Sequence, residues 1–350
     1  MSANFPVTKI AESRLREGMD ISFGKTFTDH MLVADYANGQ WGKVEIIPYQ
    51  PIPFYPALMA LHYGQEIFEG IKAYINKNGE TVIFRPDRNF KRFNESAARM
   101  EMPEVPEEIF LGGMKQLIAL DKDWIPQKDN HSLYIRPFMF ATDEYLGVRP
   151  SLTYKFIIIL SPSGPYFAKP ARILVEDHYT RAAPGGVGRA KNAGNYGGSL
   201  KAAADAQKKG FDQVLWTDPF EHKWLQEVGA MNVMFVYKDK VVTPSLDEGT
   251  VLEGVTRDSA IVVLREMGKS VEERPVNIDE LVQEYKNGNL TEAFGTGTAA
   301  VVSMIQQLSY RDMDMEFDVA NAPVAAELAQ RLAAIRTGEA EDAHGWIFRV

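Results

Sequence analysis

The sequence contains no cysteine among its 350 residues, which excludes disulfide bonds, thiolate metal sites and a cysteine nucleophile. Its six histidines are scattered, with no pair at metal-ligand spacing, so we expect no metal site. Long apolar runs are also missing, because the strongest, FIIIL at 156–160, is far shorter than a membrane span. Residues 1–20 lack the apolar centre of a signal peptide. These absences predict a soluble protein of the cytoplasm.

Positive charge is in deficit, since 38 Lys and Arg residues stand against 47 Asp and Glu residues, for a net charge of -9. Nucleic-acid binding normally needs a basic face, so we expect no nucleic-acid partner. A content of 45% hydrophobic and 24% charged residues is ordinary for a globular protein. A chain of this length exceeds what one core usually serves, which predicts two domains with a cleft between them.

The chain changes character at the Pro- and Gly-containing stretch SPSGPYFAKP. Before it, we expect a strand at 82–84, a helix from about Asp87 and a helix over 109–118. After it come an Ala-rich helix ended by Gly210, several short strands, and helices near Thr256 and near the C-terminus. We therefore predict an N-terminal α/β domain (1–162), a linker (163–174) and a C-terminal domain (175–350).

One lysine, Lys191, stands in the glycine-rich segment GGVGRAKNAGNYGG at 185–198. The segment is either a flexible surface loop with a solvated lysine, or a cradle whose backbone and Lys191 receive a flat ligand. A lysine nucleophile must be neutral, a state that the nearby cations Arg181 and Arg189 would favour. The phenol of Tyr196 could then hydrogen-bond an oxygen beside an aldehyde.

Glu227, in WLQEVGAMNVMF, comes just before a markedly apolar strand. It is either a solvated strand end or a buried acid, and a buried acid needs a cation to keep it ionised. The pyridinium nitrogen of pyridoxal phosphate is one such cation.

Gly254, Val255 and Thr256, in LEGVTRDSA, directly precede a helix. The free N–H groups of a helix N-terminus can bind an anion, and a threonine hydroxyl adds a donor. Simple N-capping by Thr256 is the alternative.

The stretch AFGTGTAAVV matches a dinucleotide-binding pattern at Gly295, Gly297 and Ala300, but it lies far from the start of any βαβ repeat. We favour a second set of N–H groups, with Thr296 and Thr298, for a phosphate or carboxylate.

Together, GRAKNAGNYGGSL, LQEVGAMNVMFV, LEGVTRDSA and FGTGTAAVVS have the order and spacing of fold-type IV pyridoxal phosphate enzymes. With LHYGQEIFEGIKAY and FRPDRNFKRFNESAARM upstream, the sequence resembles a branched-chain amino-acid aminotransferase over nearly its whole length. The resemblance implies an α/β (α+β) fold with a small N-terminal α/β domain, a larger C-terminal pseudo-barrel domain, and the cofactor between them. It also implies transfer of the amino group of leucine, isoleucine or valine to 2-oxoglutarate through pyridoxal 5'-phosphate, giving the branched 2-oxo acid and L-glutamate.

The same resemblance assigns roles to individual residues. Lys191 attaches the cofactor covalently and shuttles the substrate proton, Tyr196 faces the phenolic oxygen, and Glu227 pairs with the pyridine nitrogen. The implied phosphate-binding residues are Arg92, Val255, Thr256 and Thr298. The implied substrate-binding residues are Tyr63, Phe68, Tyr134, Arg136, Tyr166, Thr298 and Ala299, with Val148 contributed by the second subunit of a homodimer.

Other functions stay open at this stage. Another fold-type IV enzyme, such as a D-amino-acid aminotransferase or an aminodeoxychorismate lyase, is less favoured because of FEGIKAY and YIRPFMFATDEYLGV. A non-catalytic cofactor carrier would not need Lys191, Tyr196 and Glu227 together. Arg136 is either a ligand for the second carboxylate of 2-oxoglutarate or a structural partner of a neighbouring acid.

Overall fold

The computed structural model describes residues 4–128, 131–164, 169–298 and 301–350. The chain forms two compact units. The first comprises residues 1–166, 190–193 and 334–350, and the second comprises residues 167–189 and 194–333. The four residues around Lys191 therefore pack with the first unit, although both flanking segments belong to the second.

The first unit is built on one sheet, with strands in the order β17-β5-β4-β6-β7-β1-β2 and with β3 paired to β6. Its pairings are antiparallel. The strands are β1 (His30–Ala37), β2 (Gln40–Pro48), β3 (Glu66–Phe68), β4 (Ile71–Ile75), β5 (Thr81–Phe84), β6 (Ser132–Ala141), β7 (Tyr154–Ser163) and β17 (Ile347–Arg349).

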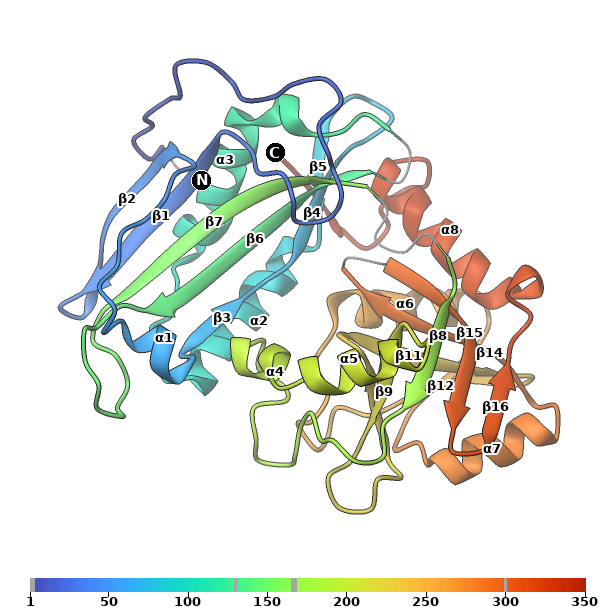
Figure 1. Cartoon of the computed structure of the whole chain (residues 1–350). Coiled ribbons are helices and arrows are strands. Elements are labelled where there is room, and N and C mark those ends of the chain that lie inside the picture. Colours follow the sequence, from blue (N-terminus) through green and yellow to red (C-terminus); the bar gives the residue numbers. More distant parts are fainter. Residues whose placement is uncertain (1–3, 129–130, 165–168, 299–300) are drawn as a thin grey trace. The chain divides into compact units, whose positions relative to one another are not determined.

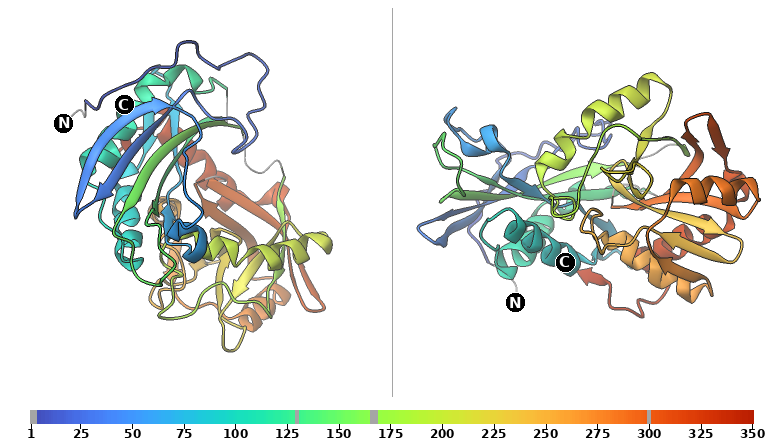
Figure 2. Two further views of the ribbon diagram at one scale, coloured as in Figure 1. Left: turned by 60° about the vertical axis from the view of Figure 1, so that its left-hand side comes forward. Right: turned by 90° about the horizontal axis from the view of Figure 1, so that it is seen from below.

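Alternation along β6 gives this sheet two different faces, as expected for a strand whose successive side chains point to opposite sides. Leu133 and Ile135 enter the main core, together with side chains of α2 and α3, which cover this face (Figures 1 and 2). Tyr134 and Arg136 point to the other face. The helical elements of this unit are α1 (Met59–Tyr63), α2 (Pro86–Arg99), η1 (Glu108–Gly112), α3 (Gly113–Leu120) and η2 (Lys122–Trp124).

Helix α2 has a proline at its first position, and it buries a stripe with the spacing of one helix face. The stripe contains Phe93 and Ala97, as a core-facing helix should. It also contains Asn89, Arg92 and Ser96, which are polar and yet buried. A helix that buries polar side chains must supply them with partners, so this face of α2 belongs to a site as well as to the core.

The second unit is a barrel-like sheet with strands in the order β10-β9-β8-β15-β14-β11-β12-β13 and with β16 paired to β15. An additional β10–β11 pairing closes the strands β10-β9-β8-β15-β14-β11 into a ring. The strands are β8 (Ala171–Val175), β9 (Gln213–Thr217), β10 (Leu225–Val228), β11 (Met231–Tyr237), β12 (Lys240–Thr243), β13 (Ser270–Glu273), β14 (Leu290–Gly297), β15 (Val301–Tyr310) and β16 (Met313–Glu316). This ring confirms the predicted pseudo-barrel.

Helices pack around this ring: α5 contacts β9, while α6 and α7 contact β14 (Figure 2). The helical elements of this part of the chain are α4 (Ala193–Gly197), α5 (Leu200–Lys208), α6 (Val255–Glu266), α7 (Ile278–Lys286), η3 (Val319–Asn321) and α8 (Pro323–Thr337). Gly210 ends the α5 region with φ of 85°, a left-handed conformation that glycine adopts at little cost.

Two details differ from the sequence expectations. Strand β17 joins β5 of the first sheet, whereas the sequence placed the whole C-terminus in the second domain. The single helix expected over 109–118 is a π-helical turn followed by α3. In agreement with the sequence analysis, which disfavoured a dinucleotide site, Gly295 and Gly297 both lie within β14, which pairs antiparallel with β15 and opens no helix at these glycines.

Candidate active site

The backbone of Lys191 is held on both sides by the first unit. The Phe68 N–H donates to the Lys191 carbonyl over 3.0 Å, and the Lys191 N–H donates to the Ser96 hydroxyl over 3.0 Å. Asn192 forms an isolated antiparallel bridge with Ile67. The glycine-rich segment is thus anchored at its lysine to β3 and α2, which argues against a freely flexible loop.

Three consecutive residues, Phe68, Glu69 and Gly70, stand at the end of β3 and have different roles near Lys191. The Lys191 ammonium nitrogen lies 4.8 Å from the centre of the Phe68 ring, and the Arg136 guanidinium carbon lies 4.6 Å from that same centre. Gly70 leaves room for Tyr134, because a Cβ at position 70 would lie 2.2 Å from the Tyr134 hydroxyl oxygen. A side chain at position 70 would therefore displace the Tyr134 ring.

Glu69 is fully buried and binds two residues of α2. The Arg92 guanidinium donates through Nε to Oε1 over 2.7 Å and through Nη2 to Oε2 over 2.9 Å. Asn89 donates to Oε2 over 2.8 Å. Burial alone would raise the pKa of the Glu69 carboxyl, but the charges of Arg92 and Lys191 and these hydrogen bonds together hold that pKa below its usual value.

Arg136 lies against aromatic rings on the face of β6 opposite the main core. Its Nη2 donates to the Tyr134 hydroxyl over 3.0 Å, and its Nε is buried with no hydrogen-bond partner among the described residues. Burial raises the pKa of the nearby Glu66, and the charge of Arg136 offsets part of that rise. The structure thus places an acid, Glu66, within electrostatic reach of Arg136, with no ion pair of 4.0 Å or less between them among the described residues.

In the second unit, Glu227 is buried in β10 with both carboxylate oxygens bound. Its Oε2 lies 2.5 Å from Nη2 of Arg181, which is itself buried. Its Oε1 accepts from the Leu252 N–H over 2.9 Å and from the Asn232 amide over 3.2 Å. Of the two sequence interpretations of Glu227, the structure therefore supports the buried acid paired with a cation.

Glu227, Asn232 and Thr296 form a row across three strands, because Glu227 pairs with Asn232 and Asn232 pairs with Thr296. The Thr296 hydroxyl is buried without a hydrogen-bond partner among the described residues. A Cβ on Gly254 would lie 1.9 Å from the Asn232 amide oxygen, so the N-terminus of α6 abuts this row.

Gly254 is the N-cap of α6, and none of the side chains that the structure describes caps this helix end. Val255 and Thr256 are the first two helical residues, so Thr256 does not take the N-cap position that the alternative interpretation gave it. A helix N-terminus of this kind, beside a buried hydroxyl and a buried carboxylate, fits a phosphorylated and protonated heterocycle.

The glycine-rich segment needs its small residues for close packing within the second unit. A Cβ on Gly188 would lie 2.7 Å from the Thr250 carbonyl oxygen and 2.6 Å from the Ala182 Cβ. The two cations expected to act on Lys191 have acidic partners instead, since Arg181 pairs with Glu227 and Arg189 pairs with Glu253 at 2.9 Å. Arg181 and Arg189, which are close in sequence to Lys191, thus pair with carboxylates that are distant from it in sequence.

The other predicted site residues are placed as follows. In the first unit, Tyr63 ends α1 and donates its hydroxyl hydrogen bond to the Leu146 carbonyl. Val148 is 86% exposed on the loop after β6. In the second unit, Tyr196 is half-buried in α4, and Thr298 is half-buried directly after β14. Tyr166 and Ala299 lie outside the described residues.

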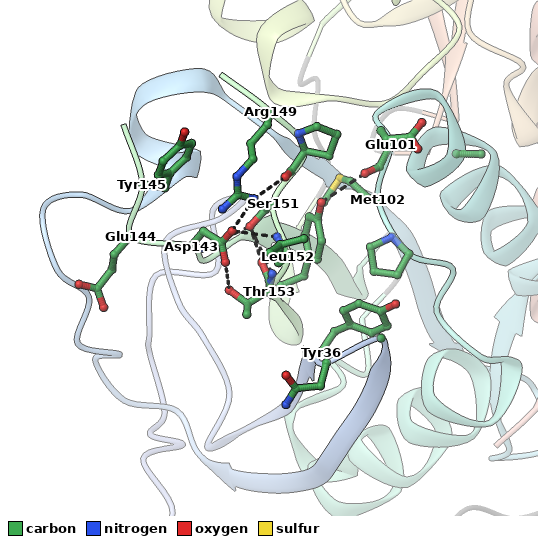
Figure 3. Close-up of a pocket in the computed structure, with 16 residues that line it drawn as sticks. Tyr36, Glu101, Met102, Asp143, Glu144, Tyr145, Arg149, Ser151, Leu152 and Thr153 are labelled. Atoms are coloured by element: carbon green, nitrogen blue, oxygen red, sulfur yellow. Dashed lines mark hydrogen bonds and ion pairs between the residues drawn. The ribbon is translucent and has the colours of Figure 1, made fainter. Parts of the chain in front are cut away.

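The loop that carries Val148 borders an open cavity of about 1010 Å³ in the first unit (Figure 3). Asp143, at the start of this loop, binds two residues near its other end. Its carboxylate accepts from the Leu152 N–H over 2.9 Å and pairs with the Arg149 guanidinium at 2.9 Å. Bonds from Leu152, Thr153 and Arg149 outweigh burial and keep the pKa of Asp143 low. The cavity lining includes Tyr36, Glu101 and Leu152, and none of its residues was predicted to bind substrate.

The roles of three charged residues were not predicted from the sequence. Glu69 and Arg181 were not assigned as partners of Arg92 and Glu227, although every buried charge needs a partner. Lys72, on β4 opposite Tyr134, was overlooked because it stands among apolar residues. Burial, reinforced by the charge of Arg336, lowers the pKa of Lys72 to about 7. On basicity alone, Lys72 is therefore an alternative to Lys191 as the amine nucleophile of the first unit.

The part of the chain that the structure describes holds no group of three or more His, Cys, Asp or Glu side chains that could bind a metal ion. Among its helices, none is both long enough and apolar enough to cross a membrane.

Comparison with known proteins identifies the family of this chain. Residues 66–308 match the family model of the amino-transferase class IV proteins. A probable branched-chain-amino-acid aminotransferase of Staphylococcus epidermidis is 51% identical over 93% of this chain and 92% of its own length. Branched-chain amino acid aminotransferase of Escherichia coli has a TM-score of 0.76 and 26% identity, over 91% of this chain and 98% of that one. The T.th. enzyme of the same name, complexed with N-(5'-phosphopyridoxyl)-L-glutamate, has a TM-score of 0.71 and 27% identity, over 90% and 97%. The chain therefore belongs to the class IV amino-transferase family.

Proposed function

We propose that this protein is a branched-chain-amino-acid aminotransferase that uses pyridoxal 5'-phosphate. It transfers the amino group of leucine, isoleucine or valine to 2-oxoglutarate, giving the branched 2-oxo acid and L-glutamate. The observation that carries the proposal is the position of Phe68, whose ring contacts both the Lys191 ammonium and the Arg136 guanidinium. The Phe68 ring thus lies beside both the amine that acts at the substrate α-carbon, Lys191, and the cation that binds a second carboxylate, Arg136.

An assay with separate amino donors tests this function. Purified protein with the cofactor and 2-oxoglutarate should form glutamate from leucine, isoleucine and valine, and not from D-alanine. Preference for D-alanine would indicate a D-amino-acid aminotransferase instead. Absence of turnover with every donor would indicate a protein that only carries the cofactor.

The cofactor, when bound, supplies a protonated ring that accepts the electron pair released at the substrate α-carbon. The chain's own residues bind it and move the proton. We assign covalent attachment and proton transfer at the α-carbon to Lys191, a hydrogen bond to the phenolic oxygen to Tyr196, and a charge opposite the ring nitrogen to Glu227. The phosphate-binding residues in this proposal are Arg92, Val255, Thr256 and Thr298.

The structural fit of the second unit to this cofactor rests on three features. Glu227 is a buried carboxylate paired with the Arg181 guanidinium, and a carboxylate in this position can also face a protonated ring nitrogen. The N-terminus of α6 is not capped by any described side chain, which leaves backbone N–H groups for phosphate oxygens. The buried Thr296 hydroxyl gives a further donor on the same row as Glu227.

The substrate pocket that we propose combines apolar rings with few polar groups, as small-molecule sites usually do. Phe68 and Tyr134 enclose a branched side chain, and Arg136 between them binds the distal carboxylate of 2-oxoglutarate. The other residues of the proposed pocket are Tyr63, Tyr166, Thr298 and Ala299, with Val148 from a second subunit.

Arg136→Met tests how one pocket accepts both an isobutyl group and a carboxylate. Removing the charged hydrogen bond should weaken transition-state binding of 2-oxoglutarate by about 1.5–3 kcal/mol. Leucine needs no cation at this position, so its KM should change little. Steady-state kinetics with each substrate varied in turn measures the difference, and equal losses for both substrates would show that Arg136 only supports the fold.

We also infer that the enzyme is a homodimer. Support comes from apolar side chains exposed on neighbouring segments of the first unit, where the Tyr63–Leu146 hydrogen bond joins α1 to the Val148 loop. These exposed residues are Phe54, Tyr55, Leu61, Tyr145, Leu146, Val148 and Leu152. A sedimentation mass of one chain would contradict the dimer.

The cytoplasmic location stays a prediction from the sequence.

A further inference from the structure

Glu69 stands where the backbone around Lys191 and the side chain of Arg92 meet. It directly follows Phe68, whose N–H donates to the Lys191 carbonyl, and its carboxylate binds both donors on one edge of Arg92. Ser96 completes a loop of contacts, because its hydroxyl accepts from the Lys191 N–H and donates to the Arg92 carbonyl over 2.9 Å.

We propose that Glu69 is the positioning residue of the phosphate-binding arginine, fixing the plane of the Arg92 guanidinium and the separation of that plane from Lys191. This inference rests on the proposed function, which gives phosphate binding to Arg92 and covalent attachment to Lys191. The ligand class concerned is a phosphate monoester carried by an aldehyde, since the two groups bind opposite ends of such a molecule.

The physical reason lies in the bidentate geometry of the Arg92 guanidinium bound to the Glu69 carboxylate. Two parallel N–H···O bonds lock the guanidinium in one plane, which a single bond or a point charge does not do. Asn89 and the Gly70 N–H also bind Glu69 Oε2, over 2.8 Å and 3.1 Å, so the carboxylate cannot rotate independently. A fully buried and fixed carboxylate therefore fixes Arg92, which has only 7% of its surface exposed.

A positioning role and a purely structural role of Glu69 predict different effects on cofactor binding. If Glu69 positions Arg92, its replacement weakens binding of the phosphate and leaves binding of the aldehyde end nearly intact. A residue that only stabilises the fold would weaken both ends alike. The comparison therefore needs a pair of ligands that differ only in the phosphate, namely pyridoxal 5'-phosphate and pyridoxal.

The experiment measures the affinity of the full-length apoprotein for each of these two ligands by absorbance titration. Glu69→Gln should lower the affinity for pyridoxal 5'-phosphate by about tenfold or more, as expected when a bidentate charged contact loses its geometry. The affinity for pyridoxal should fall by much less. Asp121→Asn is the matched control, because Asp121 is also buried and pairs with His30 at 2.6 Å in the same unit. The Asp121→Asn variant should leave unchanged the affinity ratio, defined as the affinity for pyridoxal 5'-phosphate divided by the affinity for pyridoxal.

Two further variants distinguish failure of the positioning role of Glu69 from failure of the phosphate-binding role of Arg92. Glu69→Asp keeps the charge and shortens the reach, so it should reduce the affinity ratio by less than Glu69→Gln, and it carries the test if Glu69→Gln does not fold. An unchanged ratio in a folded Glu69 variant, with a reduced ratio in Arg92→Met, would overturn the positioning role and leave the proposed function standing. An unchanged ratio in Arg92→Met as well would remove Arg92 from the phosphate site, and this inference with it.

Discussion

Lys191→Ala is expected to reduce kcat for leucine transamination by roughly 10²–10⁴-fold, the usual contribution of a positioned proton-transfer group. The variant has no nitrogen to take the α-proton, and it cannot hold the cofactor covalently. Its fold should survive, because the Lys191 contacts with Phe68 and Ser96 are made by backbone atoms that alanine keeps. Stopped-flow kinetics with leucine, read as the rate of spectral change of the added cofactor, measures the loss.

Lys72→Met is the control for this variant. Burial lowers the pKa of Lys72 to about 7, so on basicity alone it is a candidate for the same chemistry. We expect Lys72→Met to keep covalent attachment, since the proposed function gives that role to Lys191. A Lys191→Ala enzyme with unimpaired turnover would contradict the assignment.

Glu227→Gln is expected to keep the cofactor bound but to lower kcat by roughly 10²–10³-fold, as removal of a preorganised electrostatic partner does. The amide cannot stabilise a proton on the ring nitrogen, and that stabilisation counts most in the transition state. The variant still offers an oxygen to the Leu252 N–H, so local backbone structure should be retained.

The same substitution leaves Arg181 buried without its carboxylate, so the free energy of unfolding should also fall. Thermal unfolding separates this effect from catalysis, and kcat should be measured well below the lowered Tm. Turnover at the parent rate with a lowered Tm would show that Glu227 serves Arg181 alone.

The sequence left two interpretations of Glu227, and burial was one of them because the carboxylate precedes a markedly apolar strand. It did not identify the cation that the structure places beside this carboxylate. Arg181 is near Lys191 in sequence and follows β8, and the pairings of β8 with β9 and of β9 with β10 bring Glu227 towards it. Pairings between strands distant in sequence are set by tertiary packing, which short-range patterns do not report.

Glu69 could have been found from the sequence by a weaker signal. Helix α2 places Asn89, Arg92 and Ser96 at the spacing of its buried face, and a buried arginine requires an acid. The candidate acids are many, however, and the sequence does not tell which strand lies against α2. Likewise, β17 is a short strand whose partner β5 is remote in sequence, so its place in the first sheet was not predictable.

The central claim, that Lys191 carries the cofactor, is tested most directly by reducing the holoenzyme with borohydride and mapping the labelled peptide. Reduction fixes the attached pyridoxyl group to whichever lysine holds it. The account predicts a single labelled peptide containing Lys191, within the segment GRAKNAGNY. A label on Lys72, the lysine of lowered pKa on β4, or on any other lysine would contradict it.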